Sequence, residues 1–327
     1  MSTVAGDSDL ADRLRERLGR RHPVVAAATV AAGEVRLASI GAPLGAGFEI
    51  GSVSKGFTGL LYADALERDE VSAASVLGDL LPLGASPAAG IALSDLSTHC
   101  SGLPRLPRGA VSLRTYRDLW FHGVNPYGED LHELLVQGAA VRLGRPRPSY
   151  SNLGFELLGH ALASAAGTTY RELLATRICA PLGLASVYVP YTPDDLRPDA
   201  LVGTSRSGRV QQAWTGEALA PAGGIRASIE DMARFTLSLL DGSAPGRAAL
   251  DPVRSFAGPA VRIGAAWITV ERRGLHVTWH NGGTGGFRSW LGIDRSAGTG
   301  VVVLSATARS VDGAGSAMLA ELTARSR

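Results

Sequence analysis

Ser52 and Lys55 are the two residues whose types and spacing most directly suggest covalent chemistry. Lys55 is the single lysine among 32 lysine and arginine residues, and it stands three positions after Ser52. Arginine keeps its proton near neutral pH, whereas a lysine removed from water can release it. Residues three apart on a helix share one face, so the amino group can reach the serine hydroxyl. The Ser-x-x-Lys pattern therefore predicts a nucleophilic serine with a lysine as its proton partner.

Tyr150 and Asn152 form a second candidate pair, at the start of an apolar helical stretch. Two residues apart in a loop, both can face one cleft while Phe155 and Leu158 are buried. A tyrosine hydroxyl loses its proton at about pH 10, and a nearby ammonium group lowers that pKa. Lys55 is the only lysine available to do so. We therefore expect Tyr150 to act beside Lys55, although a hydrogen-bonded loop tyrosine is the alternative for this pattern standing alone.

A strand-like stretch ending in glycines forms the third candidate element. It contains His280, Asn281, Gly282 and Gly283, and Arg288 follows after two more glycines. Glycine weakens a strand interior, so glycines here indicate that a ligand or another backbone approaches closely. They also leave backbone N–H groups available to donate hydrogen bonds. The alternative is a glycine-rich hairpin turn with a histidine at the end of a strand.

In this order and at these intervals, the three motifs resemble those of the serine β-lactamase and penicillin-binding-protein superfamily. The resemblance points in particular to the class C branch with its related esterases and D-amino-acid peptidases. Residues 96–104 and 220–225 are similar to that family as well. The likeness spans most of the chain, and the combination of motifs is far more specific than any one of them.

The resemblance implies a role for each matching residue. Ser52 would be the acylated nucleophile and Lys55 its proton partner. Tyr150 would be the general base, and the acid toward the leaving group, while Asn152 would hold Lys55 and the substrate amide or ester. The backbone N–H groups of Ser52 and Gly283 would form the oxyanion hole.

The third motif departs from the pattern of the family. The β-lactamases and carboxypeptidases carry Lys-Thr-Gly, which helps to hold a substrate carboxylate, whereas here His280, Asn281 and Gly282 stand in its place. A histidine is mostly uncharged near neutral pH, so the electrostatic attraction is weaker. This argues against efficient β-lactam hydrolysis and favours esters or small peptides. Arg288 could replace the missing charge, the alternative being a strand arginine that faces solvent.

The elements that must position these residues follow from hydrophobic patterns. Helices are predicted over residues 8–20, 52–67, 94–99, 114–122, 130–137, 152–166, 169–178, 228–240 and 312–325. Strands are predicted over residues 24–32, 34–41, 259–271, 275–281, 286–293 and 299–306. Ser228 is the expected N-cap of its helix. Neither half alone supplies a sheet of common size, so we expect the early hairpin and the late strands to join one antiparallel sheet.

The predicted fold is thus an α/β (α+β), β-lactamase-like domain whose antiparallel sheet is flanked by helices. Residues 1–74 and 226–327 would form this domain, and residues 75–225 a mostly helical inserted domain. Ligand clefts commonly form at such domain interfaces.

Composition limits the other possibilities. The chain of 327 residues is 45% hydrophobic and carries a net charge of +2, so neither nucleic acid nor an anionic membrane is indicated as a partner. High alanine, glycine and arginine content explains why lysine is rare, but not why the one remaining lysine stands three positions after a serine.

Cys100 and Cys179 are too few for a disulfide scaffold, no Cys-x-x-Cys metal motif is present, and no cofactor is expected. A thiol dyad of His99 and Cys100 is disfavoured because adjacent side chains point apart.

A membrane anchor and a secretory leader are also disfavoured. No apolar run has the length needed to span a bilayer. The apolar residues 24–32 follow two arginines, but the acidic residues Asp7, Asp9, Asp12 and Glu16 precede them, which is atypical of a positively charged leader. We expect a cytoplasmic protein that acts on a small ester or peptide, with the oligomeric state left open.

The motifs favour a metal-free serine hydrolase that works through an acyl-enzyme. An acyltransferase would use the same four groups, with an alcohol or amine in place of water. A β-lactamase or D-Ala-D-Ala carboxypeptidase is a narrower alternative. The non-enzymatic alternative is a binding protein that is acylated without turnover. The presence of the full set of candidate catalytic residues argues against it, namely Ser52, Lys55, Tyr150 and Asn152.

Overall fold

The computed structural model describes residues 3–106, 123–272 and 274–326. Its largest element is an antiparallel sheet of nine strands in the order β1-β3-β2-β11-β10-β9-β8-β7-β6. The strands of this sheet are β1 (Val4–Gly6), β2 (Val25–Ala31), β3 (Glu34–Ile40), β6 (Arg254–Ser255), β7 (Val261–Ile263), β8 (Ile268–Arg272), β9 (Leu275–Gly283), β10 (Arg288–Asp294) and β11 (Thr299–Ser305). A separate pair joins β4 (Phe48–Glu49) to β5 (Arg226–Ala227).

Both ends of the chain contribute to the large sheet, which confirms the predicted fold. β2 pairs along its length with β11, so that Ala28 lies opposite Val302. Successive side chains of a strand point to opposite faces, and here both faces are buried. Val25 and Val303 belong to an apolar cluster on one face, while Ala28 and Val302 belong to a larger cluster on the other.

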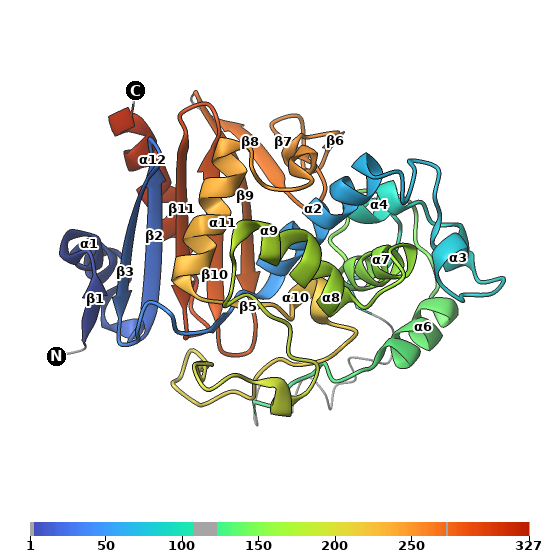
Figure 1. The fold of residues 1–327 in the computed structure, drawn as a ribbon, viewed down its shortest axis with the longest axis horizontal. Helices are drawn as coiled ribbons and strands as arrows, with labels where there is room; N and C mark the ends of the chain where they lie inside the picture. Colours follow the sequence, from blue (N-terminus) through green and yellow to red (C-terminus); the bar gives the residue numbers. More distant parts are fainter. Residues whose placement is uncertain (1–2, 107–122, 273, 327) are drawn as a thin grey trace.

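Helices cover both faces of the sheet (Figure 1). On one face, α1 (Ser8–Leu18) packs against β3, and α12 (Asp312–Ser326) packs against β10 and β11. On the other face, α11 (Ile229–Asp241) packs against β2 and β11. Ser228 is the N-cap of α11, as predicted, because its hydroxyl accepts a hydrogen bond from the Asp231 N–H at 3.2 Å.

The middle of the chain forms a group of helices beside the sheet, with α2 (Ser54–Glu67) between the two (Figure 1). These helices are α3 (Leu77–Leu80), α4 (Leu93–Ser97), α6 (Leu131–Ala140), α7 (Asn152–Ala165), α8 (Tyr170–Leu174), α9 (Ala180–Leu182) and α10 (Ala220–Gly223). The predictions for residues 94–99, 130–137, 152–166 and 169–178 correspond to α4, α6, α7 and α8, the last continuing as the π-helical turn Ala175–Cys179. The helix predicted over residues 114–122 lies outside the described residues.

One strand prediction is wrong. The single strand expected over residues 259–271 is a hairpin of β7 and β8. A turn separates the two strands, because the Gly264 N–H donates to the carbonyl of Trp267 at 2.9 Å and Ala266 has a φ of 69°. Gly264 was the one turn signal in this apolar stretch, and a single glycine inside a strand pattern is also compatible with a bulge. The short strands β1, β4, β5 and β6 were also not predicted.

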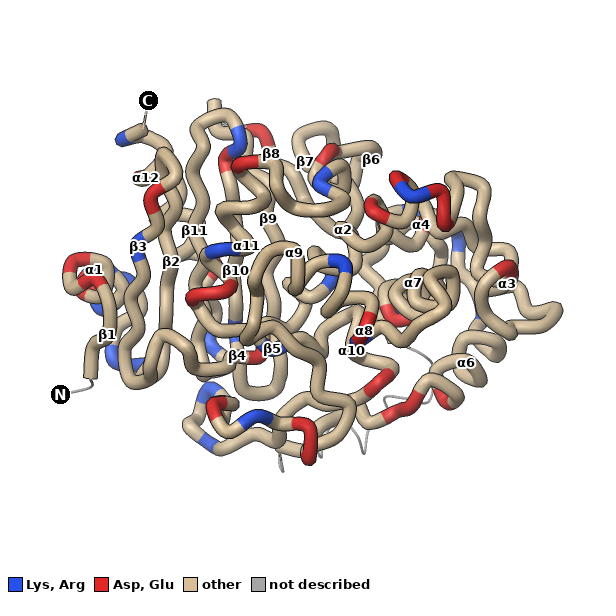
Figure 2. The backbone as a smooth tube through the Cα atoms, in the orientation of Figure 1, with Lys and Arg blue, Asp and Glu red and all other residues tan. Residues whose placement is uncertain are grey.

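The domain boundaries at residues 74/75 and 225/226 stay predictions. One apolar cluster runs without interruption from the sheet, through Phe57 of α2, to Leu157 of α7. Acidic and basic residues are interspersed along the whole backbone (Figure 2), in keeping with the small net charge. Within the described residues, none of the helices combines the length and the apolar character that a membrane span requires.

Candidate active site

Ser52 lies in the 3-10 turn Gly51–Val53, which leads directly into α2. Lys55 follows in the first turn of α2 and is completely buried. Its Nζ atom lies 3.2 Å from Ser52 Oγ and donates a hydrogen bond to the carbonyl oxygen of Ala222 at 2.5 Å. The predicted pair is therefore in contact, and α10 supplies a third group that the sequence did not reveal.

Burial lowers the pKa of Lys55 to about 7, because the protein interior disfavours the charged ammonium form. The negative charge of an ionised Glu156 raises this pKa, and the nearby guanidinium of Arg105 lowers it further. A substantial fraction of Lys55 is thus uncharged near neutral pH, as the sequence argument required.

Tyr150 stands beside both residues. Its hydroxyl is hydrogen-bonded to Ser52, and Lys55 Nζ lies 4.9 Å from the centre of its ring. Burial raises the pKa of Tyr150 to about 12. The expectation that Lys55 lowers the pKa of Tyr150 is therefore wrong, because loss of hydration outweighs the effect of neighbouring charges. With this pKa, the Tyr150 hydroxyl keeps its proton near neutral pH.

His99 holds the segment that carries Tyr150. Its ring centre lies 4.4 Å from that of Tyr150, and its Nδ1 accepts a hydrogen bond from the Ser151 N–H at 3.2 Å. Its carbonyl oxygen accepts a further hydrogen bond from the Ser149 N–H at 2.9 Å. His99 is thus packed against the tyrosine rather than paired with Cys100, whose thiol donates to the carbonyl of Thr98.

Asn152 is the first residue of α7 but does not hold Lys55 as expected. Its Nδ2 donates to the hydroxyl of Tyr127 at 3.2 Å. Its Oδ1 is buried and has no hydrogen-bond partner among the described residues. The amino group of Lys55 is directed instead to Ser52 and Ala222. Asn152 is therefore not a partner of Lys55, and its amide oxygen lies buried beside the hydroxyl-bearing side chain of Tyr127.

Glu156 is a candidate residue that the sequence analysis missed. It lies one helical turn beyond Asn152 on α7, is buried, and has one carboxyl oxygen without a partner among the described residues. Burial raises its pKa to about 8, while the charge of Lys55 opposes that rise. A glutamate between Phe155 and Leu157, both completely buried, was the signal that could have revealed it, because an ionisable group on an apolar helix face needs an explanation.

The third motif lies at the end of β9, where successive side chains face opposite sides of the sheet. His280 points inward, and its ring centre lies 6.3 Å from that of Tyr150. Asn281 points to the other face, where its Nδ2 donates to Oδ1 of Asp312 at 3.2 Å. His280 therefore packs beneath the site on the side of Tyr150, whereas Asn281 lines the pocket that contains Ser52.

His280 is neutral under ordinary conditions. Burial lowers its pKa to about 3, and the charge of Lys55 lowers it further. Its Nδ1 lies 2.7 Å from the carbonyl oxygen of Asn281, so Nδ1 must carry the proton and donate. Its Nε2 is therefore an unprotonated acceptor, and it has no partner among the described residues. This residue supplies no positive charge for a substrate.

Glycines allow the third motif to approach the nucleophile. A Cβ atom on Gly282 would lie 2.0 Å from the carbonyl oxygen of Ile50 and 3.0 Å from the backbone nitrogen of Ser52. A Cβ atom on Gly51, whose φ is 52°, would lie 2.5 Å from the backbone nitrogen of Gly283. The segments that carry the backbone nitrogens of Ser52 and Gly283 are therefore in direct contact, and both residues line the same pocket.

These groups open into a pocket of about 850 Å³. Ser52, Tyr150 and Gly283 line it together with three arginines, namely Arg105, Arg206 and Arg288, and with the acidic Asp312. One amino group of Arg288 donates to the carbonyls of Thr284 and Phe287, which fixes the side chain at the pocket wall. The pocket is therefore rich in guanidinium groups although His280 is neutral.

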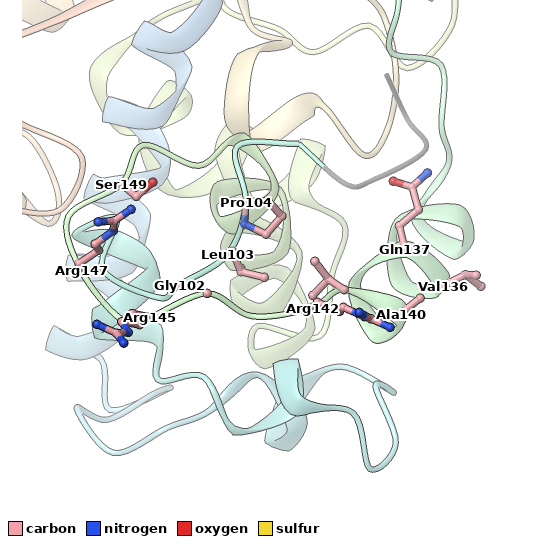
Figure 3. A pocket seen from close by; sticks show the side chains of 12 residues that line it. Gly102, Leu103, Pro104, Val136, Gln137, Ala140, Arg142, Arg145, Arg147 and Ser149 are labelled. Carbon is pink, nitrogen blue, oxygen red and sulfur yellow. The ribbon is translucent and has the colours of Figure 1, made fainter. Parts of the chain in front are cut away.

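A second pocket, of about 540 Å³, lies beside the segment that leads to Tyr150 (Figure 3). Leu103, Pro104 and Ser149 line it with three exposed arginines, Arg142, Arg145 and Arg147. None of the predicted site residues lines this pocket. In the part of the chain that the structure describes, no three His, Cys, Asp or Glu side chains are grouped so that they could hold a metal ion.

Comparisons with known proteins agree with this geometry. The family model named Beta-lactamase matches residues 10–325. The beta-lactamase-like protein of Arthroderma benhamiae is 27% identical over 296 residues, which are 79% of this chain and 48% of that protein. The D-alanyl-D-alanine-carboxypeptidase/endopeptidase AmpH of Escherichia coli K12 is 30% identical over 152 residues, which are 45% of this chain and 38% of that protein.

The chain thus spans about half the length of the curated relatives it matches. The class C beta-lactamase from Rhodobacter sphaeroides has the same fold, with a TM-score of 0.79, 22% identity, and coverage of 98% of this chain and 99% of that chain. The family model, which covers nearly the whole sequence, decides the assignment. This chain belongs to the beta-lactamase family, whose members are serine hydrolases.

Proposed function

We propose that this protein cleaves small esters or peptides through an acyl-enzyme formed on Ser52. The observation that carries the proposal is the contact of Ser52 Oγ with the buried amino group of Lys55 at 3.2 Å. A lysine with a pKa of about 7 can accept the hydroxyl proton near neutral pH, which an ordinary lysine cannot do. The pocket of about 850 Å³ gives a substrate access to that hydroxyl.

Acylation would begin when neutral Lys55 takes the proton of Ser52 and the oxygen attacks the substrate carbonyl carbon. The carbonyl oxygen becomes negatively charged and would accept hydrogen bonds from the N–H groups of Ser52 and Gly283. Each such donor contributes about 3 kcal/mol to stabilising the transition state. The third motif and the nucleophile meet closely enough to form this site only because Gly51 and Gly282 lack side chains.

Collapse of the tetrahedral intermediate would break the bond to the leaving group. Tyr150, which is protonated near neutral pH, would donate its proton to that group and regain one from the ammonium of Lys55. A water molecule would then attack the acyl-enzyme while its proton passes to Lys55, which the preceding step left neutral. Lys55 would return this proton to the Ser52 oxygen as the acid leaves. Each group returns to its starting state.

The acyl-enzyme is tested with a fluorophosphonate probe and p-nitrophenyl acetate. The probe should add mass to Ser52, and Ser52→Ala should remove both the label and turnover. Lys55→Arg keeps a positive charge but cannot offer a neutral base, so it should lower kcat/KM by about 1,000-fold or more. Label on another residue, or full turnover by Lys55→Arg, would refute the assignment.

D-alanyl peptides with a free carboxylate are the second candidate substrates. Arg105, Arg206 and Arg288 in the pocket favour them, since guanidinium groups pair well with carboxylates. AmpH, one of the similar proteins, is described as a D-alanyl-D-alanine carboxypeptidase/endopeptidase. A panel of p-nitrophenyl esters, D-alanyl peptides and nitrocefin separates the classes, with esters expected to be hydrolysed fastest. Rapid nitrocefin turnover would contradict the argument from neutral His280.

A further inference from the structure

A third cavity, of about 600 Å³, lies on the outer face of the sheet. Its apolar wall consists of Val270 on β8 and of Leu275, Val277 and Trp279 on β9. The three β9 residues alternate along the strand and share the face opposite to His280. All four side chains are half-buried. We call this cavity the β9 groove.

The β9 groove exists because α12 covers only part of that face. α12 packs against β10 and β11, where the Trp290 ring lies directly against Gly315. Trp290 is buried by this contact and forms the inner limit of the groove. The apolar residues of β8 and β9 lie beyond the part of the sheet that α12 covers. Their outer face therefore borders the groove and is not packed against other core residues.

Two residues connect the groove with the catalytic pocket. Asn281 and Asp312 line both cavities, and the hydrogen bond between their side chains stands at the boundary. The pairing of β9 with β8 ends at Trp279 opposite Ile268. Residues 280–283 continue toward Ser52 beyond this point. Among the strand pairs that the structure describes, they pair with β10 and not with β8. This leaves one edge of the segment beside both cavities.

We propose that the β9 groove binds an apolar acyl or leaving group of the substrate, so that the enzyme prefers esters carrying a medium-length alkyl or aromatic group. This inference rests on the proposed function and narrows its substrate class. Gly283 and Trp279 are four strand residues apart, a span of about 13 Å, which a medium-length alkyl chain can bridge. An apolar chain from the carbonyl at Ser52 would pass the Asn281–Asp312 pair and lie against Trp279.

A series of p-nitrophenyl acetate, butyrate, hexanoate and decanoate tests this inference. Burial of a methylene group corresponds to roughly a fourfold gain, so the decanoate-to-acetate ratio of kcat/KM should be about tenfold or more even if few methylenes are buried. Trp279→Ser removes the ring, and Val277→Thr replaces a methyl group by a hydroxyl at nearly constant shape. Both should lower the ratio, whereas Val35→Ser, at an exposed apolar position of β3, should not.

Each result has one reading. Wild-type turnover of acetate with a flat chain-length profile would overturn the groove inference and leave the proposed function intact. Loss of turnover of every ester by the wild type would overturn the proposed function itself. If Trp279→Ser and Val277→Thr leave the ratio unchanged, the inference is wrong. A change confined to the molecular mass measured by light scattering would also overturn it, and would identify the groove as a surface for self-association.

Discussion

Lys55 on α2 and Glu156 on α7 are both buried, and each influences the charge of the other. Burial lowers the pKa of the lysine and raises that of the glutamate, so both groups favour their neutral forms. A proton on the Glu156 carboxyl group leaves the lone pair of the Lys55 nitrogen free to act on Ser52. The pair therefore links the reactivity of the nucleophile to pH.

The first prediction concerns the acid limb of the pH profile. In the wild type, kcat/KM for p-nitrophenyl acetate should rise with pH through about 7, as Lys55 becomes neutral. An ionised Glu156 raises the pKa of Lys55, so Glu156→Gln should lower that pKa and move the limb to lower pH. Glu67→Gln, at the exposed end of α2, is the matched control and should leave the limb in place. A limb that moves to higher pH would contradict the proposed coupling.

The second prediction separates the two roles of Tyr150. As a proton donor it matters most for leaving groups that are strong bases. Tyr150→Phe should therefore lower kcat/KM for ethyl esters or amides by about 100-fold or more, and lower it much less for p-nitrophenyl esters, whose phenolate leaves unprotonated. Equal losses for both substrates would indicate that Tyr150 is instead the base for Ser52.

The third prediction concerns Gly282. An added methyl group would meet the carbonyl of Ile50 and Oγ of Ser289, which donates to that carbonyl at 2.6 Å. Gly282→Ala should lower the free energy of unfolding by about 1–3 kcal/mol and displace the backbone of Ser52, reducing kcat. Gly90→Ala, where a Cβ meets nothing within 4 Å, is the control. Urea unfolding and esterase activity measure both effects, and a Gly282→Ala enzyme as stable and active as the wild type would contradict the prediction.

The fourth prediction concerns the stability cost of Lys55. Its folded pKa of about 7 lies below the ordinary value of 10.5, so the unfolded chain binds more protons between these limits. The lysine thus destabilises the fold most at pH 7 and below, and the cost disappears as pH rises toward 10.5. Lys55→Met should abolish turnover yet raise the free energy of unfolding at pH 7 by about 1–3 kcal/mol, after loss of its hydrogen bonds. The gain should shrink at pH 10, and a gain independent of pH would refute this account.

Much of the fold follows from the sequence because its strands and helices carry strong patterns. The hairpin of β2 and β3 turns at Gly33, whose φ is 79°, and glycine is the residue that adopts this conformation most easily. The turn between β7 and β8 could not be predicted in the same way, because Ala266 adopts a positive φ that tertiary contacts impose. Its N–H donates to the carbonyl of Ser97, far away in the sequence.

The site shows the same division. The spacing of Ser52 and Lys55 on one helical turn predicts their contact, and local geometry suffices for it. The hydrogen bond from Lys55 to Ala222 joins residues 167 positions apart, and no local pattern indicates it. The sequence led us to expect a lowered pKa for Tyr150, whereas the pKa is raised. The charge of a neighbouring residue can be read from the sequence, but the depth of burial cannot.

The pairing of β2 with β11 has a consequence for biosynthesis. Val25 lies opposite Ser305, so the centre of the sheet joins residues 280 positions apart in the sequence (305 − 25). Contacts between segments so distant in the sequence form slowly. The hairpin of β2 and β3 therefore exposes apolar side chains to solvent until β11 is available to pair with β2. Because β9 and β10 are joined to β2 through β11, the sheet that presents the glycine-rich end of β9 to Ser52 is complete only after β11 has been synthesised. We therefore expect a nascent chain that lacks β11 to have no esterase activity.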